Sequence, residues 1–120
     1  MATETIFVSV IDGTTALTFE DNAGNSGKEI TTDCNCGDKI KWKVRTEGLV
    51  ITGIPMKDGT PSIWAEGKKP AMKSKNWVGT ICETAAGKTA SYSVQYTING
   101  GAQLEQDPKI HVDGEDGTGS

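Results

Sequence analysis

The side chains best suited to metal or redox chemistry are three cysteines, Cys34, Cys36 and Cys82, and a single histidine, His111. Zinc and other thiophilic metals prefer thiolate and imidazole ligands, so the three thiols could hold a metal if Asp33 or His111 came near. Zinc sites more often use paired Cys-x2-Cys motifs, which this chain lacks. An odd cysteine count in a reducing compartment is typical of free thiols. A thiol-based metal or redox role is therefore one hypothesis, and ordinary free thiols are the simpler one.

Catalytic signatures are absent from the sequence. His111 could serve as a general base, but no nucleophile or orienting partner is recognisable beside it, and catalysis needs a partnered base. No Gly-x4-Gly-Lys-Ser/Thr or Gly-x-Gly-x-x-Gly segment opens a helix, so a nucleotide loop is not expected. The sequence predicts a non-enzymatic protein without a cofactor.

A second group of candidate residues lies in the segment 55–74, which carries three of the four prolines and several lysines. Trp64 in this segment either fills one end of the fold or stands exposed as a binding anchor. Lys68, Lys69 and Lys73 around it are most simply solvated. The alternative is that they contact an anion, a glycan or an acidic partner surface.

The elements that must position these residues are predicted to be β-strands. In the stretch 37–44, Ile40, Trp42 and Val44 alternate with three lysines, so one face of the strand is apolar and the other is cationic. Trp42 is the predicted core residue of this strand. Asn99-Gly100 is the strongest hairpin signal.

Similar alternation recurs along the chain, and turn residues separate the alternating stretches. This pattern predicts an all-β fold, an antiparallel Greek-key β-sandwich of seven to nine strands. Residues 1–113 are expected to form a single domain, and residues 114–120 a disordered acidic tail. The expected strands span residues 4–11, 16–20, 28–32, 37–44, 49–54, 76–83, 91–98 and 109–112.

The first predicted strand, 4–11, is largely apolar on both faces, with Phe7 among the residues of its second face. An edge strand of this kind invites pairing with another chain, so Phe7 is a candidate partner contact. This observation favours a protein that works through protein contacts, as an accessory or assembly subunit or by self-association.

The bulk properties exclude several partners. The net charge of −4 and the pI near 4.9 disfavour nucleic acid as the main partner. No run approaches 18 apolar residues, so no membrane span is expected. The N-terminal residues lack the features of a signal peptide, which predicts a cytoplasmic location unless a leader was removed.

The order of the motifs GDKIKWKV, NWVGTI, YSVQYTI and DPKIHV resembles the cupredoxin-like β-sandwich of plastocyanin and azurin, over residues 28–113. An immunoglobulin-like sandwich is the alternative architecture. Blue-copper sites use two histidines, one cysteine and usually a methionine. The resemblance would place the first histidine ligand near Leu49 or Val50, and the loop 99–107 has no Cys, His or Met. The resemblance therefore implies the scaffold without its copper.

Three functional hypotheses follow from the sequence. The first is a non-enzymatic, metal-free sandwich that acts through protein contacts. The second is a module that binds a small anion or glycan with Trp64 and the lysine-rich segment 55–74. The third is the thiol-based role of Cys34, Cys36 and Cys82.

Overall fold

The structure is a computed structural model that describes residues 3–60 and 62–113. Within these residues it consists of strands and turns without any helix, which confirms the all-β prediction. No helix of the described residues is therefore long and apolar enough to cross a membrane. In chain order the strands are β1 (Thr3–Val10), β2 (Leu17–Asp21), β3 (Ser26–Gly27), β4 (Thr31–Cys34), β5 (Lys39–Val44), β6 (Leu49–Gly53), β7 (Ala71–Lys73), β8 (Asn76–Thr80), β9 (Thr89–Ser91), β10 (Val94–Ile98), β11 (Leu104–Gln106) and β12 (Lys109–Val112).

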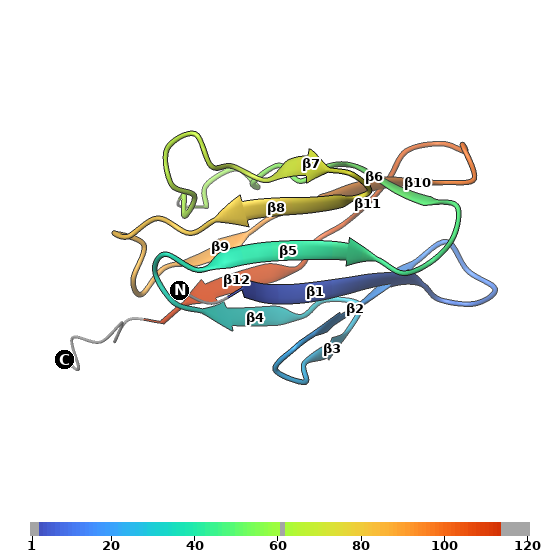
Figure 1. The fold of residues 1–120 in the computed structure, drawn as a ribbon. Coiled ribbons are helices and arrows are strands. Elements are labelled where there is room, and N and C mark those ends of the chain that lie inside the picture. Colours follow the sequence, from blue (N-terminus) through green and yellow to red (C-terminus); the bar gives the residue numbers. More distant parts are fainter. Residues whose placement is uncertain (1–2, 61, 114–120) are drawn as a thin grey trace.

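The strands form three sheets. A six-stranded sheet has the order β3-β2-β1-β5-β8-β7, and its strands β1, β5 and β8 run side by side in Figure 1. Two three-stranded sheets, β11-β10-β6 and β4-β12-β9, are called here the β10 sheet and the β12 sheet. They adjoin, because residues 92–93 alone separate β9 from β10 and the Tyr92 N–H donates to the Pro108 carbonyl at 3.2 Å. The arrangement is consistent with a β-sandwich.

The pairing is mixed, which corrects the prediction of an antiparallel fold. β1 runs parallel to β5, and β12 runs parallel to β4, while the other strand pairs are antiparallel. Parallel neighbours cannot be joined by a tight hairpin, so each parallel pair joins segments that are distant in the sequence. Alternation alone shows which face a residue occupies and does not show the direction of the neighbouring strand.

The position of β1 corrects a second expectation. The strand is internal, between β2 and β5, so its backbone is paired on both sides and it is no edge for another chain. Ile6 and Val8 are fully buried, whereas Phe7 points to the opposite face and is half-buried. The Arg45 guanidinium lies over the Phe7 ring, 3.7 Å from its centroid, and bonds Glu20 at 3.1 Å. The second apolar face of β1 is thus partly covered by the protein itself.

The core confirms the prediction for Trp42, which is fully buried on β5. Its indole N–H donates to the Tyr92 hydroxyl at 3.2 Å, and the two rings meet edge to face with centroids 5.5 Å apart. Trp64 packs against the same indole at 5.9 Å. A buried indole N–H without an acceptor costs free energy. The Tyr92 hydroxyl therefore fixes β5 of the six-stranded sheet against the chain between β9 and β10.

Local details of the sequence prediction were correct in two places. Lys39 and Lys43 on β5 are exposed as the alternation requires. Asn99 and Gly100 form the turn between β10 and β11, with φ of 51° and 76°, and the Gly101 N–H closes it on the Ile98 carbonyl. Positive φ at both central positions is the geometry for which Asn-Gly is preferred.

Other boundaries differ. The described residues contain twelve strands instead of seven to nine, because short strands such as β3, β7 and β11 lie in segments read as loops. The predicted strand 28–32 is shifted to β4, and the long connection 55–74 contains β7. The predicted tail 114–120 lies outside the described residues.

Candidate functional site

A groove of about 470 Å³ opens where β6 faces β7 across the gap between two sheets. We call it the edge groove. β6 is the last strand of the β10 sheet and β7 the last strand of the six-stranded sheet, so two sheet edges border it. Its lining residues are Val44, Arg45, Thr46, Glu47, Gly48, Leu49, Val50, Ile51, Met72, Ser74 and Lys75.

The edge groove exposes apolar side chains that the rest of the described surface does not. Val50 and Met72 are 49% and 53% exposed, and they are the exposed large hydrophobic residues of the described part of the chain. Leu49 and Ile51 are buried on the other face of β6, so alternation leaves Val50 on the solvent side. Isolated exposed apolar residues are ordinary, whereas these two line the same groove.

A tryptophan fixes the two edges relative to each other. Trp77 on β8 pairs in register with Met72 on β7, and its indole N–H donates to the Ile51 carbonyl of β6 at 3.1 Å. This bond links the six-stranded sheet to the edge of the β10 sheet beside the groove. Trp77 is half-buried, so it is a core residue only in part.

Lysines gather next to the edge groove. A second hollow, of about 440 Å³, lies on the solvent-facing side of the six-stranded sheet and shares Ser74 with the groove. We call it the lysine hollow. Its cationic residues are Lys39 and Lys41 from β5 and Lys73 from β7. These two strands have only β8 between them in the sheet, so their lysines line the same hollow. The other lining residues are Thr3, Ser74, Asn76 and Val78.

The predicted binding residues are therefore divided. Lys73 joins the lysine hollow, whereas Lys68 and Lys69 are exposed in the preceding loop and line neither hollow. Trp64 is only 6% exposed and stands in the core, which agrees with the first of its two expected positions and not with the exposed anchor. Its indole N–H donates to the Met56 sulfur at 3.1 Å, so the polar atom of the ring is also occupied.

The buried position of Trp64 has a local cause. Its six-membered ring lies over Gly79 on β8, where an added Cβ would come within 2.9 Å of the ring. The bridge between Trp64 and Ile81 holds the loop against the end of β8. The absence of a side chain at Gly79 makes room for the indole, and the segment 55–74 thereby closes this part of the core.

The three thiols do not assemble a metal site. Cys34 is buried, and burial, followed by nearby carboxylates, raises the pKa of its thiol to about 12. Cys36 and Cys82 are half-buried, and hydrogen bonds to Thr84 lower the pKa of Cys82. None of the three belongs to a group of three ligand atoms within 4.8 Å of one another in the described residues. The thiol-site hypothesis is therefore not supported by the geometry.

A group of three potential metal ligands does lie on the β12 sheet. It consists of Asp33, His111 and Asp113, whose ligand atoms all lie within 4.8 Å of one another. His111 was expected to lack an orienting partner, but its Nδ1 lies 2.8 Å from the Thr89 hydroxyl. In the sequence, alternation along 109–112 is a signal that places His111 and Asp113 on one face. The pairing of β12 with β4, which adds Asp33, cannot be recognised there.

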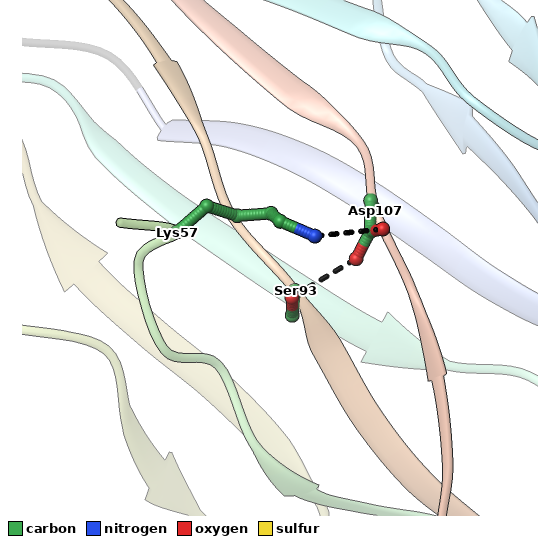
Figure 2. Close-up of polar contacts among 3 residues, drawn as sticks. All are labelled: Lys57, Ser93 and Asp107. Atoms are coloured by element: carbon green, nitrogen blue, oxygen red, sulfur yellow. Dashed lines mark hydrogen bonds and ion pairs between the residues drawn. The ribbon is translucent and has the colours of Figure 1, made fainter. Parts of the chain in front are cut away.

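A serine, an aspartate and a lysine are joined by hydrogen bonds (Figure 2). Lys57 and Asp107 also line a depression of about 530 Å³. The Ser93 hydroxyl donates to Asp107 Oδ1 at 2.9 Å, and Lys57 Nζ donates to Asp107 Oδ2 at 3.0 Å. The lysine and the serine hydrogen bonds hold the pKa of Asp107 below its usual range. A carboxylate with a lowered pKa is a weak base, so this trio does not prepare the serine for nucleophilic attack.

Comparison with known proteins identifies no family. No family model and no curated protein matches the chain. Among solved structures, the chain is similar to the cysteine protease inhibitor EhICP2 from Entamoeba histolytica, with 13% identity and a TM-score of 0.41. The match covers 92% of this chain and 96% of that one. A likeness at this level shows neither a shared family nor a shared activity.

Proposed function

We propose that this chain is a non-enzymatic β-sandwich domain that works through protein contacts, by holding an extended segment of a partner protein in the edge groove. The observation that carries the proposal is the position of Val50 and Met72. Both exposed large hydrophobic residues of the described part of the chain line one groove, and two sheet edges border that groove.

The physical basis is strand addition. The outer edges of β6 and β7 lack a strand partner within the described residues, so an extended peptide could pair with those edge groups that are not already bonded, as the Ile51 carbonyl is to Trp77. Backbone hydrogen bonds to such a peptide would supply affinity, while alternate side chains would cover Val50 and Met72. Each buried CH₂ group contributes about 0.8 kcal/mol, so even a short segment gains from this contact.

The charges favour an acidic segment. The chain carries a net charge of −4, yet Lys39, Lys41 and Lys73 gather in the lysine hollow and Lys75 stands on the wall of the edge groove. Complementary charges steer a partner and disfavour wrong ones. The proposed occupant is therefore a strand in which apolar and acidic residues alternate.

The proposal includes the cupredoxin-like, Greek-key arrangement that the motif order implies. Two features support it: the parallel pairing of β1 with β5, and the passage of the chain to the β10 sheet between β5 and β6. A fold alone assigns no activity, so the contact function depends on the groove and not on this arrangement.

Methionine methyl NMR tests the contact directly. The probe is a blocked peptide of alternating valine and glutamate, added to protein with ¹³C-labelled methionine methyl groups. We expect the Met72 methyl signal to shift in a saturable way while Met56, which lies against Trp64, stays unchanged. Val50→Asp should abolish the shift by placing a carboxylate against the acidic peptide, and Lys68→Ala, outside both hollows, should not. An unmoved Met72 signal at millimolar peptide, or an equal shift in Val50→Asp, would contradict the proposal.

A small anion is the second candidate ligand, and the lysine hollow favours it. A glycan is less suited to this surface, because Trp64, the aromatic residue expected to contact it, is buried. The same NMR titration distinguishes the two ligands when sulfate replaces the peptide. Shifts of the Asn76 and Val78 amides with sulfate, without movement of Met72, would assign the surface to anions.

A further inference from the structure

Sheet pairing brings two carboxylates and an imidazole together on the solvent-facing side of the β12 sheet. β4 and β12 are parallel, and Asp33 is the direct partner of His111 in their register. Asp113 follows His111 by two residues, so it lies on the same face, and its N–H donates to the Cys34 carbonyl at 2.8 Å. The neighbours Ile110 and Val112 point into the core. The three side chains are therefore fixed by paired backbone and not by a loose loop.

The distances within this group suit a single small cation. All three ligand atoms lie within 4.8 Å of one another, and His111 Nε2 is 4.0 Å from Asp113 Oδ1. Metal bonds of about 2.0–2.2 Å place neighbouring ligand atoms roughly 3–3.6 Å apart. Side-chain rotations that move the carboxylate oxygens by about 1 Å would bring the ligand atoms to this spacing. Such rotations are open to both residues, since Asp33 is exposed and Asp113 is half-buried.

Thr89 orients the imidazole. It is the cross-strand partner of His111 on β9, and its hydroxyl oxygen lies 2.8 Å from His111 Nδ1. When Nδ1 carries the proton and donates it to Thr89, Nε2 presents its lone pair on the side where Asp113 lies. Metal-binding histidines are commonly held in this way through the nitrogen that does not bind the metal.

Neither carboxylate of the group is neutralised by a basic side chain. Among the described residues the ion pairs with lysine or arginine join Arg45 to Glu20 and Lys57 to Asp107. Among the described residues, Asp113 pairs only with His111, at 4.0 Å, and Asp33 forms no ion pair. A divalent cation would compensate both carboxylates at once.

We propose that Asp33, His111 and Asp113 bind one first-row divalent metal ion, with Thr89 as the positioning residue of the imidazole. Two carboxylates with one imidazole form a nitrogen and oxygen donor set, which suits ions such as Zn²⁺, Co²⁺ or Mn²⁺. Three protein ligands leave further positions for water on the exposed side. This site differs from the thiol site considered above and does not depend on the edge groove.

Calorimetric titration of the full chain, untagged and stripped with a chelator, tests the site with Zn²⁺ alone. One equivalent should bind. The variants Asp33→Asn and His111→Gln should lose this binding, and Asp12→Asn, an exposed carboxylate in a turn, should keep it. Thr89→Val should keep the stoichiometry and weaken the affinity roughly 10–100-fold. Thermal melting of each variant without metal shows that loss of binding is not loss of folding.

The cysteines require their own control, because thiolates also bind zinc. The variant Cys36→Ser/Cys82→Ser should bind Zn²⁺ as the unmodified chain does. Titration with Co²⁺ should give weak visible bands without the intense near-ultraviolet band of a cobalt–thiolate bond. No uptake by the unmodified chain, full uptake by His111→Gln, or a strong thiolate band would each overturn the proposal.

Discussion

At the scale of single residues, polar atoms in the core and at its margin have partners. The buried indole N–H groups of Trp42 and Trp64 reach the Tyr92 hydroxyl and the Met56 sulfur. Burial raises the pKa of Tyr92, so the phenol stays protonated across the ordinary pH range. No buried side-chain nitrogen or oxygen of the described residues lacks a hydrogen-bond partner. Changes at these positions should therefore act on stability before they act on binding.

Asp107 gives the pH dependence of one such contact. The pKa of Asp107 is lowered in the folded protein. Its contribution to the free energy of unfolding is therefore present above the unfolded-state pKa and is lost as the pH falls through the folded-state pKa. Asp107→Asn should destabilise the protein at pH 7 by about 1 kcal/mol or less, because Lys57 and Asp107 are 42% and 43% exposed and solvent screens them. Urea unfolding at pH 7 and at pH 3 measures this, and the difference should shrink at the lower pH.

The exposed Glu66 offers a matched control for this comparison. Glu66→Gln removes a carboxylate that makes no hydrogen bond or ion pair with other described residues, so its effect should be small at both pH values. A difference between Asp107→Asn and the unmodified chain that grew on acidification would show that the pKa of Asp107 is not lowered by folding.

At the scale of elements, the long connection between β6 and β8 supplies Ile63 and Trp64 to the core. Trp64 enters over Gly79, and Pro70 lies on the same glycine, 3.2 Å from the position of an added Cβ. β7 then extends the six-stranded sheet and supplies Met72 to the edge groove. A segment without alternation thus provides both a core residue and a surface residue.

Gly79→Ala tests this packing. The new methyl group would lie 2.9 Å from Trp64, which is closer than carbon atoms approach without displacement. Overpacking of this kind costs about 1–3 kcal/mol, so the unfolding midpoint in urea should fall. Thr80→Ala on the same strand, which adds no atom, serves as the comparison. An unchanged midpoint in Gly79→Ala would indicate that Trp64 does not occupy this position in solution.

The elements also show how far the sequence could be interpreted. Alternation predicted β5 with its buried Trp42 and exposed lysines, and Asn99-Gly100 predicted the β10–β11 turn, because both depend on neighbouring residues. The parallel pairing of β4 with β12 depends on residues nearly eighty positions apart, and no local pattern reports it. The edge groove was missed for the same reason. Alternation along 49–54 is compatible with an outward Val50, but its proximity to Met72 requires the packing of two sheets.

At the scale of the whole molecule, strands from opposite ends of the described chain are internal. β1 lies between β2 and β5, and β12 lies between β4 and β9 (Figure 1). Each therefore has neighbours on both sides, and Ile110 and Val112 of β12 are fully buried. The molecule has its sheet edges elsewhere, at β3, β7, β6 and β11 and at β4 and β9.

Deletion of residues 109–113 tests this closure. We expect loss of the cooperative thermal transition, because the deletion removes the strand that pairs with both β4 and β9 and exposes their backbone. Deletion of the loop residues 101–103, which are exposed between β10 and β11, is the control and should leave a cooperative transition. Far-ultraviolet circular dichroism during heating distinguishes the two results. A cooperative transition without 109–113 would contradict the structure.

The internal place of β12 has a consequence for synthesis in the cell. A ribosome releases the chain from its first residue onward, so β4 emerges long before β12, the strand that pairs with it. Until β12 has emerged, the flank of β4 that it covers stays unpaired. A factor that shields unpaired strands would therefore act on this chain in the interval between the emergence of β4 and that of β12.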